Sequence, residues 1–204
     1  MRNSIQTLRT DRRAFIGGSD ARIIMGSSDE AALIRLWREK RGETEPEDLA
    51  GNLVVQLGAA TEELNRTWYE RNTGRRVSNA QRQVKHSAIP WMAATLDGIV
   101  EGAGAVFEAK FMLPWSFSEE AAAEKYMAQV QHNMWVTHLR TSVLSIITGG
   151  GKWWRSPSPW IRFISVFWSR RKRSSGAACN RAKRHISSMP SRRGRASRPS
   201  ASSI

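Results

Sequence analysis

Two short apolar runs separated by a glycine-rich turn constrain the fold of this chain more than any other feature of its sequence. The first run, 92–96, ends at Asp97, and in the second, 105–110, Glu108 alternates with apolar neighbours. The residues between them, 101–104, have the composition of a tight turn. We therefore expect two strands of one hairpin. Because neighbouring strands lie about 5 Å apart, the two carboxylates are expected to lie close together.

The two carboxylates and a lysine that follows them form a pattern suited to the hydrolysis of phosphodiesters. Lys110 lies two residues after Glu108, so strand alternation places both side chains on the same face. Such chemistry uses a metal ion to polarise a phosphate oxygen and activate water, and Mg²⁺ takes oxygen ligands. The pattern predicts a Mg²⁺ site at Asp97 and Glu108, with Lys110 holding the attacking water or the scissile phosphate. Two surface carboxylates beside a hairpin would have the same spacing.

Helices and further strands are expected around this hairpin. Apolar residues at helical spacing predict helices over residues 31–40, 58–71 and 121–138. A short helix is expected to begin at Ser19-Asp20, where Ser19 has the residue type of an N-cap. The residues expected to face inward are Leu33, Leu36 and Trp37 in the first long helix, Thr61, Leu64 and Trp68 in the second, and Met127, Val130 and Met134 in the third.

Residues 82–87 and 142–148 are predicted to be strands. Strands that are flanked by helices on both sides predict an α/β fold with a central mixed sheet.

Four blocks follow one another along residues 12–153, and they occupy residues 12–20, 58–74, 97–110 and 126–137. In their order and spacing they resemble the PD-(D/E)XK nucleases, and more narrowly the phage-type alkaline exonucleases of the YqaJ viral recombinase and lambda exonuclease group. The resemblance implies a restriction-endonuclease-like core, with a central mixed sheet flanked by helices.

The resemblance also implies a role for residues of each block. Arg12 and Ser19 would hold the 5′ end of DNA. The second block has a glutamate four residues after its glycine, and this register selects Glu62 rather than Glu63 as a support for the metal site. Gln129 would position the scissile phosphate.

The metal site implied by the resemblance consists of Asp97, Glu108 and the main-chain carbonyl of Ala109. The expected cofactor is Mg²⁺, with Mn²⁺ as a substitute. Lys110 would orient or deprotonate the attacking water.

The positive charge of the chain lies in its C-terminal part. The net charge is +14, and the residues after Gly150 include 14 Lys and Arg and no Asp or Glu, so residues 1–150 are balanced. A high isoelectric point therefore does not indicate that the nuclease-like part binds DNA. A basic segment rich in Arg, Ser, Pro and Gly is typical of disordered or polyanion-binding tails.

The aromatic residues of this segment do not fit a disordered arm. Codons can be chosen for residues 153–176 so that a shifted reading frame encodes an alternating strand, a proline turn and an amphipathic helix. We therefore expect an exonuclease-like domain over 1–153, incomplete and disrupted at its C-terminus, and a frameshift-derived tail over 154–204. A genuine basic tail is the alternative. A frameshift would deprive strand 142–148 of its neighbour and of its covering helix. The aromatic residues are Trp153, Trp154, Trp160, Phe163, Phe167 and Trp168.

Several classes of protein are disfavoured by the sequence. The single cysteine, Cys179, excludes an intramolecular disulfide and a thiolate zinc site. The four histidines lack ligand spacing. No secretory signal and no stretch long enough to span a membrane is recognisable, so we expect a cytoplasmic protein without a membrane partner.

Three functions remain open. The first is a Mg²⁺-dependent 5′-to-3′ exonuclease that acts on the ends of linear double-stranded DNA in phage-type recombination. The resemblance then implies a single-strand annealing protein as partner and allows a homo-oligomer. The second is a catalytically impaired remnant that only binds DNA through its basic tail, with strong salt dependence. The third is an endonuclease of the same fold, which needs no DNA end.

Overall fold

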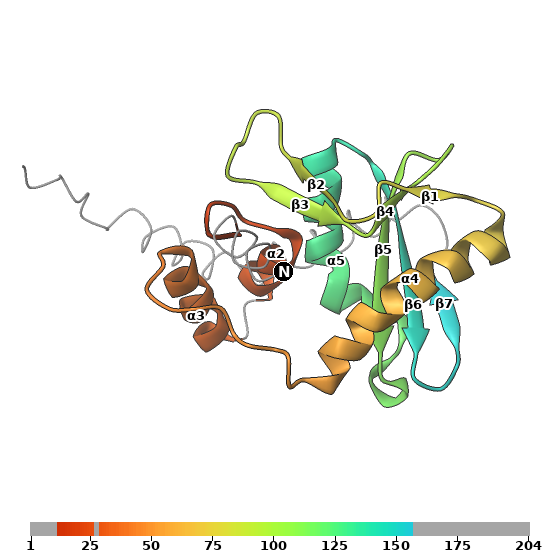
Figure 1. Ribbon diagram of the computed structural model, residues 1–204, viewed down its shortest axis with the longest axis horizontal. Coiled ribbons are helices and arrows are strands. Elements are labelled where there is room, and N and C mark those ends of the chain that lie inside the picture. The colour runs from red at the N-terminus through yellow and green to blue at the C-terminus, as the bar shows by residue number, and fades with distance from the viewer. Residues whose placement is uncertain (1–11, 27–28, 157–204) are drawn as a thin grey trace, which may run out of the picture. The chain divides into compact units, whose positions relative to one another are not determined.

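The computed structural model describes residues 12–26 and 29–156, and a five-stranded mixed sheet forms its centre (Figure 1). The strand order is β1-β4-β5-β6-β7. Neighbours β5 and β6 are parallel, and the other neighbouring pairs are antiparallel. The strands span Val77–Ser78 (β1), Gly98–Val100 (β4), Ala105–Met112 (β5), Thr141–Thr148 (β6) and Trp153–Arg155 (β7). The predicted α/β fold with a central mixed sheet is confirmed.

The run 92–96 was expected to form a hairpin with 105–110, and this prediction is wrong. Its strand, β3 (Ala93–Leu96), pairs with β2 (Arg82–Lys85) in a separate antiparallel ribbon, and the hairpin partner of β5 is the following strand, β4. The chain enters the larger sheet at Gly98, whose φ is 159°. A Cβ on Gly98 would lie 2.2 Å from Val77 Cγ1, so only glycine allows β1 to approach here. Asp97 thus lies where the chain leaves one sheet for the other.

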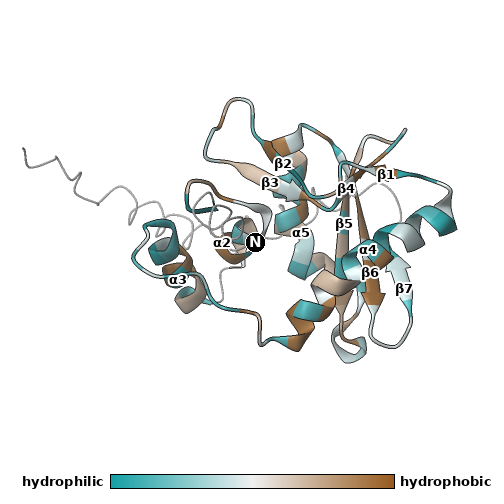
Figure 2. Cartoon of the chain, viewed as in Figure 1, coloured by the Kyte–Doolittle hydropathy of each residue, from teal (hydrophilic) through white to brown (hydrophobic). Residues whose placement is uncertain are grey.

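The sheet is covered by one long helix on each face. Helix α4 spans Leu53–Thr73 and helix α5 spans Glu119–Thr137. Helix α2 (Gly18–Met25) lies beside α5, and α3 (Glu30–Lys40) lies beside α2. The short helix η1 (Pro114–Ser116) connects β5 to α5. Alternate side chains of β5 point to opposite faces of the sheet. Phe107 packs against Tyr69 of α4, and Val106 packs in a cluster with Val130 of α5. Strand β6 lies in this apolar centre, and it is strongly hydrophobic (Figure 2).

The inward face of α4 differs from the one expected. Leu64 and Trp68 are 53% and 39% exposed, whereas Asn65 and Tyr69 are 1% and 2% exposed. The helix is turned so that the Tyr69 ring contacts the Phe107 ring, with 5.1 Å between their centroids. The apolar spacing failed as a guide because a polar residue, Asn65, faces the sheet. The expected stripe of Met127, Val130 and Met134 on α5 is buried.

The start of α2 also differs from the prediction. Its N-cap is Gly17, and both Ser19 and Asp20 lie inside the first turn. Asp20 performs the capping role from within the helix, since its Oδ2 accepts a 2.8 Å hydrogen bond from the Gly17 amide.

Strand β6 has a neighbour on its outer edge, contrary to the expectation that a frameshift would remove it. Strand β7 pairs with β6 through Trp153, Trp154 and Arg155. It crosses the boundary expected after Trp153. The remainder of the expected tail, 157–204, lies outside the described residues.

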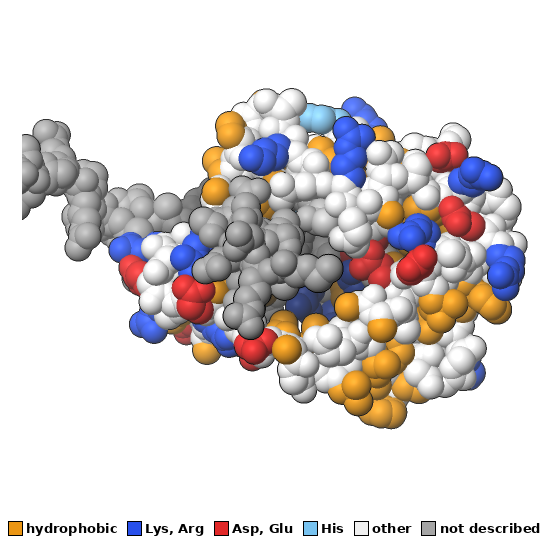
Figure 3. Space-filling view, in the orientation of Figure 1, with side chains coloured by type: hydrophobic (Ala, Val, Ile, Leu, Met, Phe, Trp, Pro, Cys, Tyr) orange, Lys and Arg blue, Asp and Glu red, His pale blue; other side chains and the backbone are white. Residues whose placement is uncertain are grey.

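Within the described ranges, no helix combines the length and the apolar composition needed to cross a membrane. On the face drawn in Figure 3, basic side chains are scattered among acidic ones and form no single positive patch. This distribution agrees with the charge balance of residues 1–150.

Candidate active site

Glu108 lies at the centre of the predicted site and is almost completely buried. Its exposed fraction is 1%, on the face of β5 that packs against α5. Gln129 Nε2 of α5 donates to Glu108 Oε1 at 2.5 Å, and Asn133 Nδ2 donates to Glu108 Oε2 at 2.8 Å. One turn of α5 thus holds both oxygens of one carboxylate. Lys110 lies on the same face of the strand, as alternation predicts, and its Nζ is 2.5 Å from Glu108 Oε1.

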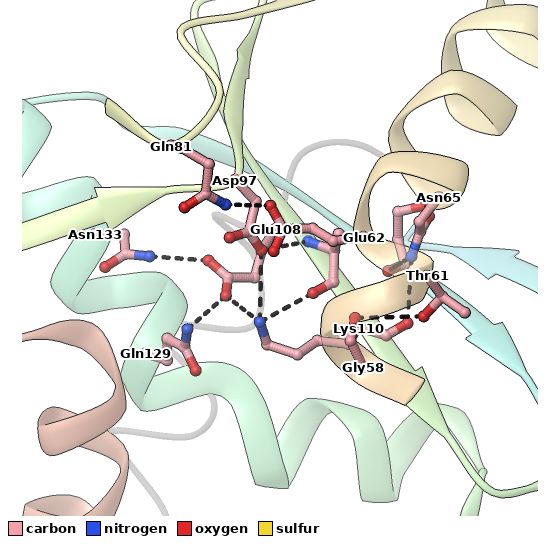
Figure 4. Close-up of polar contacts among 12 residues, drawn as sticks. Gly58, Thr61, Glu62, Asn65, Gln81, Asp97, Glu108, Lys110, Gln129 and Asn133 are labelled. Carbon is pink, nitrogen blue, oxygen red and sulfur yellow. Dashed lines mark hydrogen bonds and ion pairs between the residues drawn. The ribbon is translucent and has the colours of Figure 1, made fainter. Parts of the chain in front are cut away.

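The Lys110 ammonium contacts the three groups that were predicted as metal ligands (Figure 4). Besides Glu108 Oε1, it lies 3.5 Å from Asp97 Oδ2 and 2.9 Å from the Ala109 carbonyl oxygen. Asp97 Oδ2 also accepts a 2.9 Å hydrogen bond from the Ala109 amide. The register explains this arrangement, because Gly98 pairs with Phe107 and the residues next to them, Asp97 and Glu108, therefore lie opposite each other. Oxygen atoms of β5 and of Asp97, between β3 and β4, thus converge on one positive charge.

Burial and neighbouring charges shift the protonation of this cluster. Burial raises the pKa of Glu108 to about 7, with the Lys110 charge opposing the rise and the Asp97 charge adding to it. Burial lowers the pKa of Lys110, but the Glu108 and Asp97 carboxylates outweigh this and raise it above its ordinary value. Lys110 is therefore a cation at neutral pH, and the Glu108 carboxyl takes up a proton more readily than an exposed glutamate.

Glu62 lies next to this cluster, on α4. Its Oε1 accepts a short hydrogen bond from Gln81 Nε2, at the start of the β2–β3 ribbon. Burial, followed by the nearby Asp97 charge, raises the pKa of Glu62. The influence of Asp97 places Glu62 within electrostatic reach of the predicted ligands. Glu63, its neighbour in sequence, is exposed.

The donor atoms suit a hard divalent cation. Among the described residues, no three Asp, Glu, His or Cys side chains cluster closely enough to hold a metal by themselves. Two carboxylates and a main-chain carbonyl nevertheless face one cation, the Lys110 ammonium. Mg²⁺ is commonly held by one or two carboxylates, with water and substrate phosphate completing its octahedron. The residues Asp97, Glu108 and Ala109 fit such an ion.

The two residues expected at the DNA 5′ end form a second group. Arg12 Nη2 donates to Ser19 Oγ at 3.2 Å. Lys40 of α3 holds this segment in place, because its Nζ donates to the Arg12 and Phe15 carbonyl oxygens, each at 2.7 Å, and pairs with Asp20 at 2.6 Å.

Gly18 connects this second group with the first. A Cβ on Gly18 would lie 2.5 Å from Asn133 Oδ1 and 3.0 Å from Gln129 Cγ. The first turn of α2 therefore touches the two side chains that hold Glu108. The predicted site residues thus form a carboxylate–lysine cluster with Gln129, and an adjoining Arg12–Ser19 pair.

Sequence reasoning missed three side chains that hold the site together, namely Asn133, Gln81 and Lys40. Asn133 was accessible in principle, because it lies four residues after Gln129 and so on the same side of α5. Gln81 has a positive φ of 58° in the turn before β2, which no residue pattern indicated. Lys40 acts across 25 to 28 residues of sequence, and no local spacing reveals such a contact.

Comparisons with known proteins agree with the fold and the motif order. A family model described as the YqaJ-like viral recombinase domain matches residues 9–140. The uncharacterized protein YqaJ of Bacillus subtilis (strain 168) is 28% identical over 147 residues, which are 70% of this chain and 46% of that protein. The chain thus spans less than half the length of this curated relative.

Solved structures of exonucleases share the fold. The alkaline exonuclease LHK-Exo from Laribacter hongkongensis matches with a TM-score of 0.60 at 17% identity, over 89% of this chain and 98% of that one. Its complex with dAMP matches with a TM-score of 0.58 at 17% identity, over 87% and 95%. A phage related exonuclease from Haemophilus somnus 129PT matches with a TM-score of 0.53 at 15% identity, over 66% and 68%.

Proposed function

Because this chain belongs to the YqaJ-like viral recombinase family, we propose that it is a Mg²⁺-dependent exonuclease that degrades linear double-stranded DNA from the 5′ end. The observation that carries this proposal is the convergence of Asp97, Glu108 and the Ala109 carbonyl on one positive charge. Oxygen donors of this kind suit Mg²⁺, the ion that commonly assists phosphoryl chemistry. The exonuclease folds of the structural neighbours support the same class of reaction.

Asp97 and Glu108 would hold the cofactor together with the Ala109 carbonyl oxygen. When bound, Mg²⁺ would polarise a phosphate oxygen and lower the pKa of a water, and Mn²⁺ would substitute for it. Gln129 and Asn133 orient the Glu108 carboxylate, so that one oxygen is available to a cation that replaces Lys110. Gln81 restrains Glu62 beside the ligands, where it supports the site directly or through water.

Lys110 would act on the reacting groups. Its ammonium is protonated at neutral pH, since the two carboxylates raise its pKa. A protonated lysine donates hydrogen bonds to the scissile phosphate or to the attacking water, and it stabilises the negative charge that develops in the transition state. Gln129 would place the scissile phosphate, because its amide already lies at the Glu108 oxygen that faces Lys110.

Arg12 and Ser19 would receive the 5′ phosphate. Their mutual hydrogen bond brings one cation and one hydroxyl donor to the first turn of α2. Both groups are donors to a phosphate, and the N-terminal turn of a helix favours an anion. Removal of one strand would leave single-stranded DNA, for which a single-strand annealing protein is the natural partner.

Cleavage of end-labelled DNA tests the proposal. A linear duplex with a 5′ phosphate should be degraded in the presence of Mg²⁺, and a covalently closed circle of the same sequence should stay intact. Asp97→Asn should abolish cleavage. Asp48→Asn is the matched control, because Asp48 is an exposed loop residue, and it should retain full activity.

Other outcomes have defined meanings. Cleavage of the closed circle would indicate an endonuclease and contradict the requirement for an end. A folded chain that cleaves neither substrate with Mg²⁺ or Mn²⁺, and binds DNA equally well after Asp97→Asn, would indicate a non-catalytic DNA-binding protein. Release of label from the 3′ end would contradict the proposed polarity alone.

A further inference from the structure

A chain of hydrogen bonds, buried at its centre and part-buried at its two ends, runs from the edge strand β7 to the main chain of Lys110, the proposed catalytic lysine. Trp153 Nε1 donates to Ser145 Oγ at 2.8 Å, and Ser145 Oγ donates to Asn65 Oδ1 at 2.6 Å. Asn65 Nδ2 in turn donates to the carbonyl oxygens of Lys110, at 3.2 Å, and of Ser145, at 2.8 Å. Figure 4 shows Asn65 on α4, turned toward the strand that carries Lys110.

This chain of bonds lies in an otherwise apolar interface. The side chains around it between α4 and the sheet are Tyr69, Val100, Ala105, Phe107, Ala109 and Val143. Asn65 is 1% exposed and Ser145 is fully buried. Apolar residues of similar size would bury the same surface without the cost of desolvating an amide and a hydroxyl. Packing alone therefore does not explain why polar residues occupy these positions.

Every polar atom of the pair Asn65–Ser145 has a partner. Asn65 directs its amide nitrogen to two carbonyl oxygens and accepts one bond at Oδ1, and the Ser145 hydroxyl donates once and accepts once. A fully satisfied buried network specifies one arrangement of the elements it joins, because any sliding would leave a buried donor or acceptor unpaired. The network therefore fixes how α4 lies on the sheet.

The elements joined in this way carry the site. Glu62 lies three residues before Asn65, on the same side of α4, so the position of Asn65 sets the approach of Glu62 to Asp97. The carbonyl that Asn65 binds belongs to Lys110, the residue after the proposed ligand Ala109. Ser145 pairs with Ala109 on one side and with Arg155 of β7 on the other. Asn65 therefore fixes the positions of two parts of the site, Glu62 on α4 and the Ala109–Lys110 main chain on β5.

We propose that Asn65, Ser145 and Trp153 form a positioning network, through which the edge strand β7 holds Glu62 and the Ala109–Lys110 main chain in the arrangement needed for phosphodiester cleavage. This inference rests on the proposed nuclease function. It assigns no contact with DNA or metal to the three residues. They act through α4 and β5, and β7 becomes part of the catalytic apparatus although it contributes no reacting group.

The test separates positioning from stability. In the full-length double variant Asn65→Leu/Ser145→Ala, both members of the buried pair become apolar, and only the half-buried Trp153 indole N–H loses its acceptor, so the melting temperature should fall by no more than a few degrees. The kcat on linear duplex DNA should fall about tenfold to a hundredfold, because small displacements of catalytic groups are costly. The KM for DNA should not change, since no DNA contact is altered. Trp153→Phe removes one N–H donor and should lower kcat in the same direction by a smaller factor.

The matched control is Asn72→Leu. Asn72 lies on the same helix, is exposed, and donates only to the Trp68 carbonyl of α4 itself. It should leave kcat, KM and melting temperature unchanged. A double variant with the kcat of the parent overturns the proposal. A loss of activity that follows only the loss of folded protein also overturns it, because the network would then be merely structural.

A second readout does not depend on activity. The Ala109 amide donates to Asp97 Oδ2, and its exchange with solvent can be followed by NMR in the metal-free protein. The double variant should accelerate this exchange by more than its change in global stability accounts for, whereas Asn72→Leu should not. If the parent chain cleaves no DNA, the proposed function fails while the exchange rates still decide the inference: acceleration supports the network, and unchanged exchange contradicts it.

Discussion

Asn133 on α5 donates a 2.8 Å hydrogen bond to Oε2 of Glu108, although both side chains are 1% exposed and lie 25 residues apart. The other amide atom, Asn133 Oδ1, is buried and has no hydrogen-bond partner within the described part of the chain. A buried amide that leaves its oxygen unpaired is retained at a cost. The bond to Glu108 explains this cost, because it orients the carboxylate on which the proposed metal site depends.

We expect Asn133→Ala to weaken the site in two ways. Loss of an outer hydrogen bond to a metal-binding group should lower the affinity for Mg²⁺ about tenfold to a hundredfold. The buried oxygen of Glu108 left without a donor should lower the free energy of unfolding by about 1–3 kcal/mol. Mg²⁺ titration of DNA cleavage and chemical denaturation measure the two effects. Asn72→Ala, an exposed amide on α4, serves as control, and equal Mg²⁺ affinity in both variants would contradict the role of Asn133.

Two glycine substitutions should have opposite effects on stability, because Gly18 is closely packed between α2 and α5 and Gly58 on α4 is not. In Gly18→Ala the new Cβ would meet Asn133 Oδ1 at 2.5 Å, so α2 must shift, and both stability and cleavage should decrease. In Gly58→Ala the Cβ meets nothing within 4 Å inside helix α4, and the free energy of unfolding should rise by about 0.5–1 kcal/mol. Thermal unfolding of the two variants side by side checks the prediction. A Gly18→Ala protein as stable as the parent would exclude the close packing.

Glu62 and Glu63 form a natural pair for a test of the α4 contribution. Glu62 is half-buried beside Asp97 and bonded to Gln81, whereas Glu63 points to solvent. We expect Glu62→Gln to lower kcat at least about tenfold, in the range found for outer metal-site residues. Glu63→Gln should have no effect. Steady-state kinetics at saturating Mg²⁺ distinguishes them, and equal kcat values would remove Glu62 from the site.

Binding of Mg²⁺ should strengthen as the pH rises through about 7, the raised pKa of Glu108. Below this value the carboxyl is protonated, so the apparent affinity should fall by about tenfold per pH unit. In the metal-free protein, the free energy of unfolding changes in the opposite direction as the pH rises. Because the folded pKa exceeds the ordinary value of 4.5, the contribution of Glu108 to stability declines between pH 4.5 and about 7. Thermal shifts with Mg²⁺ at pH 6 and pH 8 measure the first effect, and equal shifts would contradict it.

Local patterns predicted the parts of the molecule that depend on neighbouring residues. Strand alternation placed Lys110 on the face of Glu108, and the turn at 101–104 led to the pairing that brings Asp97 opposite Glu108. The strand 142–148 and the buried stripe of α5 followed from the same periodicities.

Features that depend on distant contacts could not be predicted in this way. The buried side of α4 is set by Asn65, whose partners lie 45 and 80 residues away. The break at Gly98 depends on the close approach of Val77 from another strand. Composition disfavoured regular structure after Trp153, yet Trp153 and Trp154 pack against opposite faces of the sheet and β7 forms. In each case a tertiary contact outweighs the local preference.

The Lys110 ammonium, held among two carboxylates and a carbonyl, makes the protein its own counterion. Uptake of a divalent ion at the proposed site would then be an ion exchange, in which the ammonium leaves the oxygen atoms as the metal approaches. The ammonium offsets part of the negative charge of the two carboxylates in the meantime. A chain of this design would keep its fold in a metal-poor solution, so that the supply of divalent ions would govern its proposed activity and not its stability.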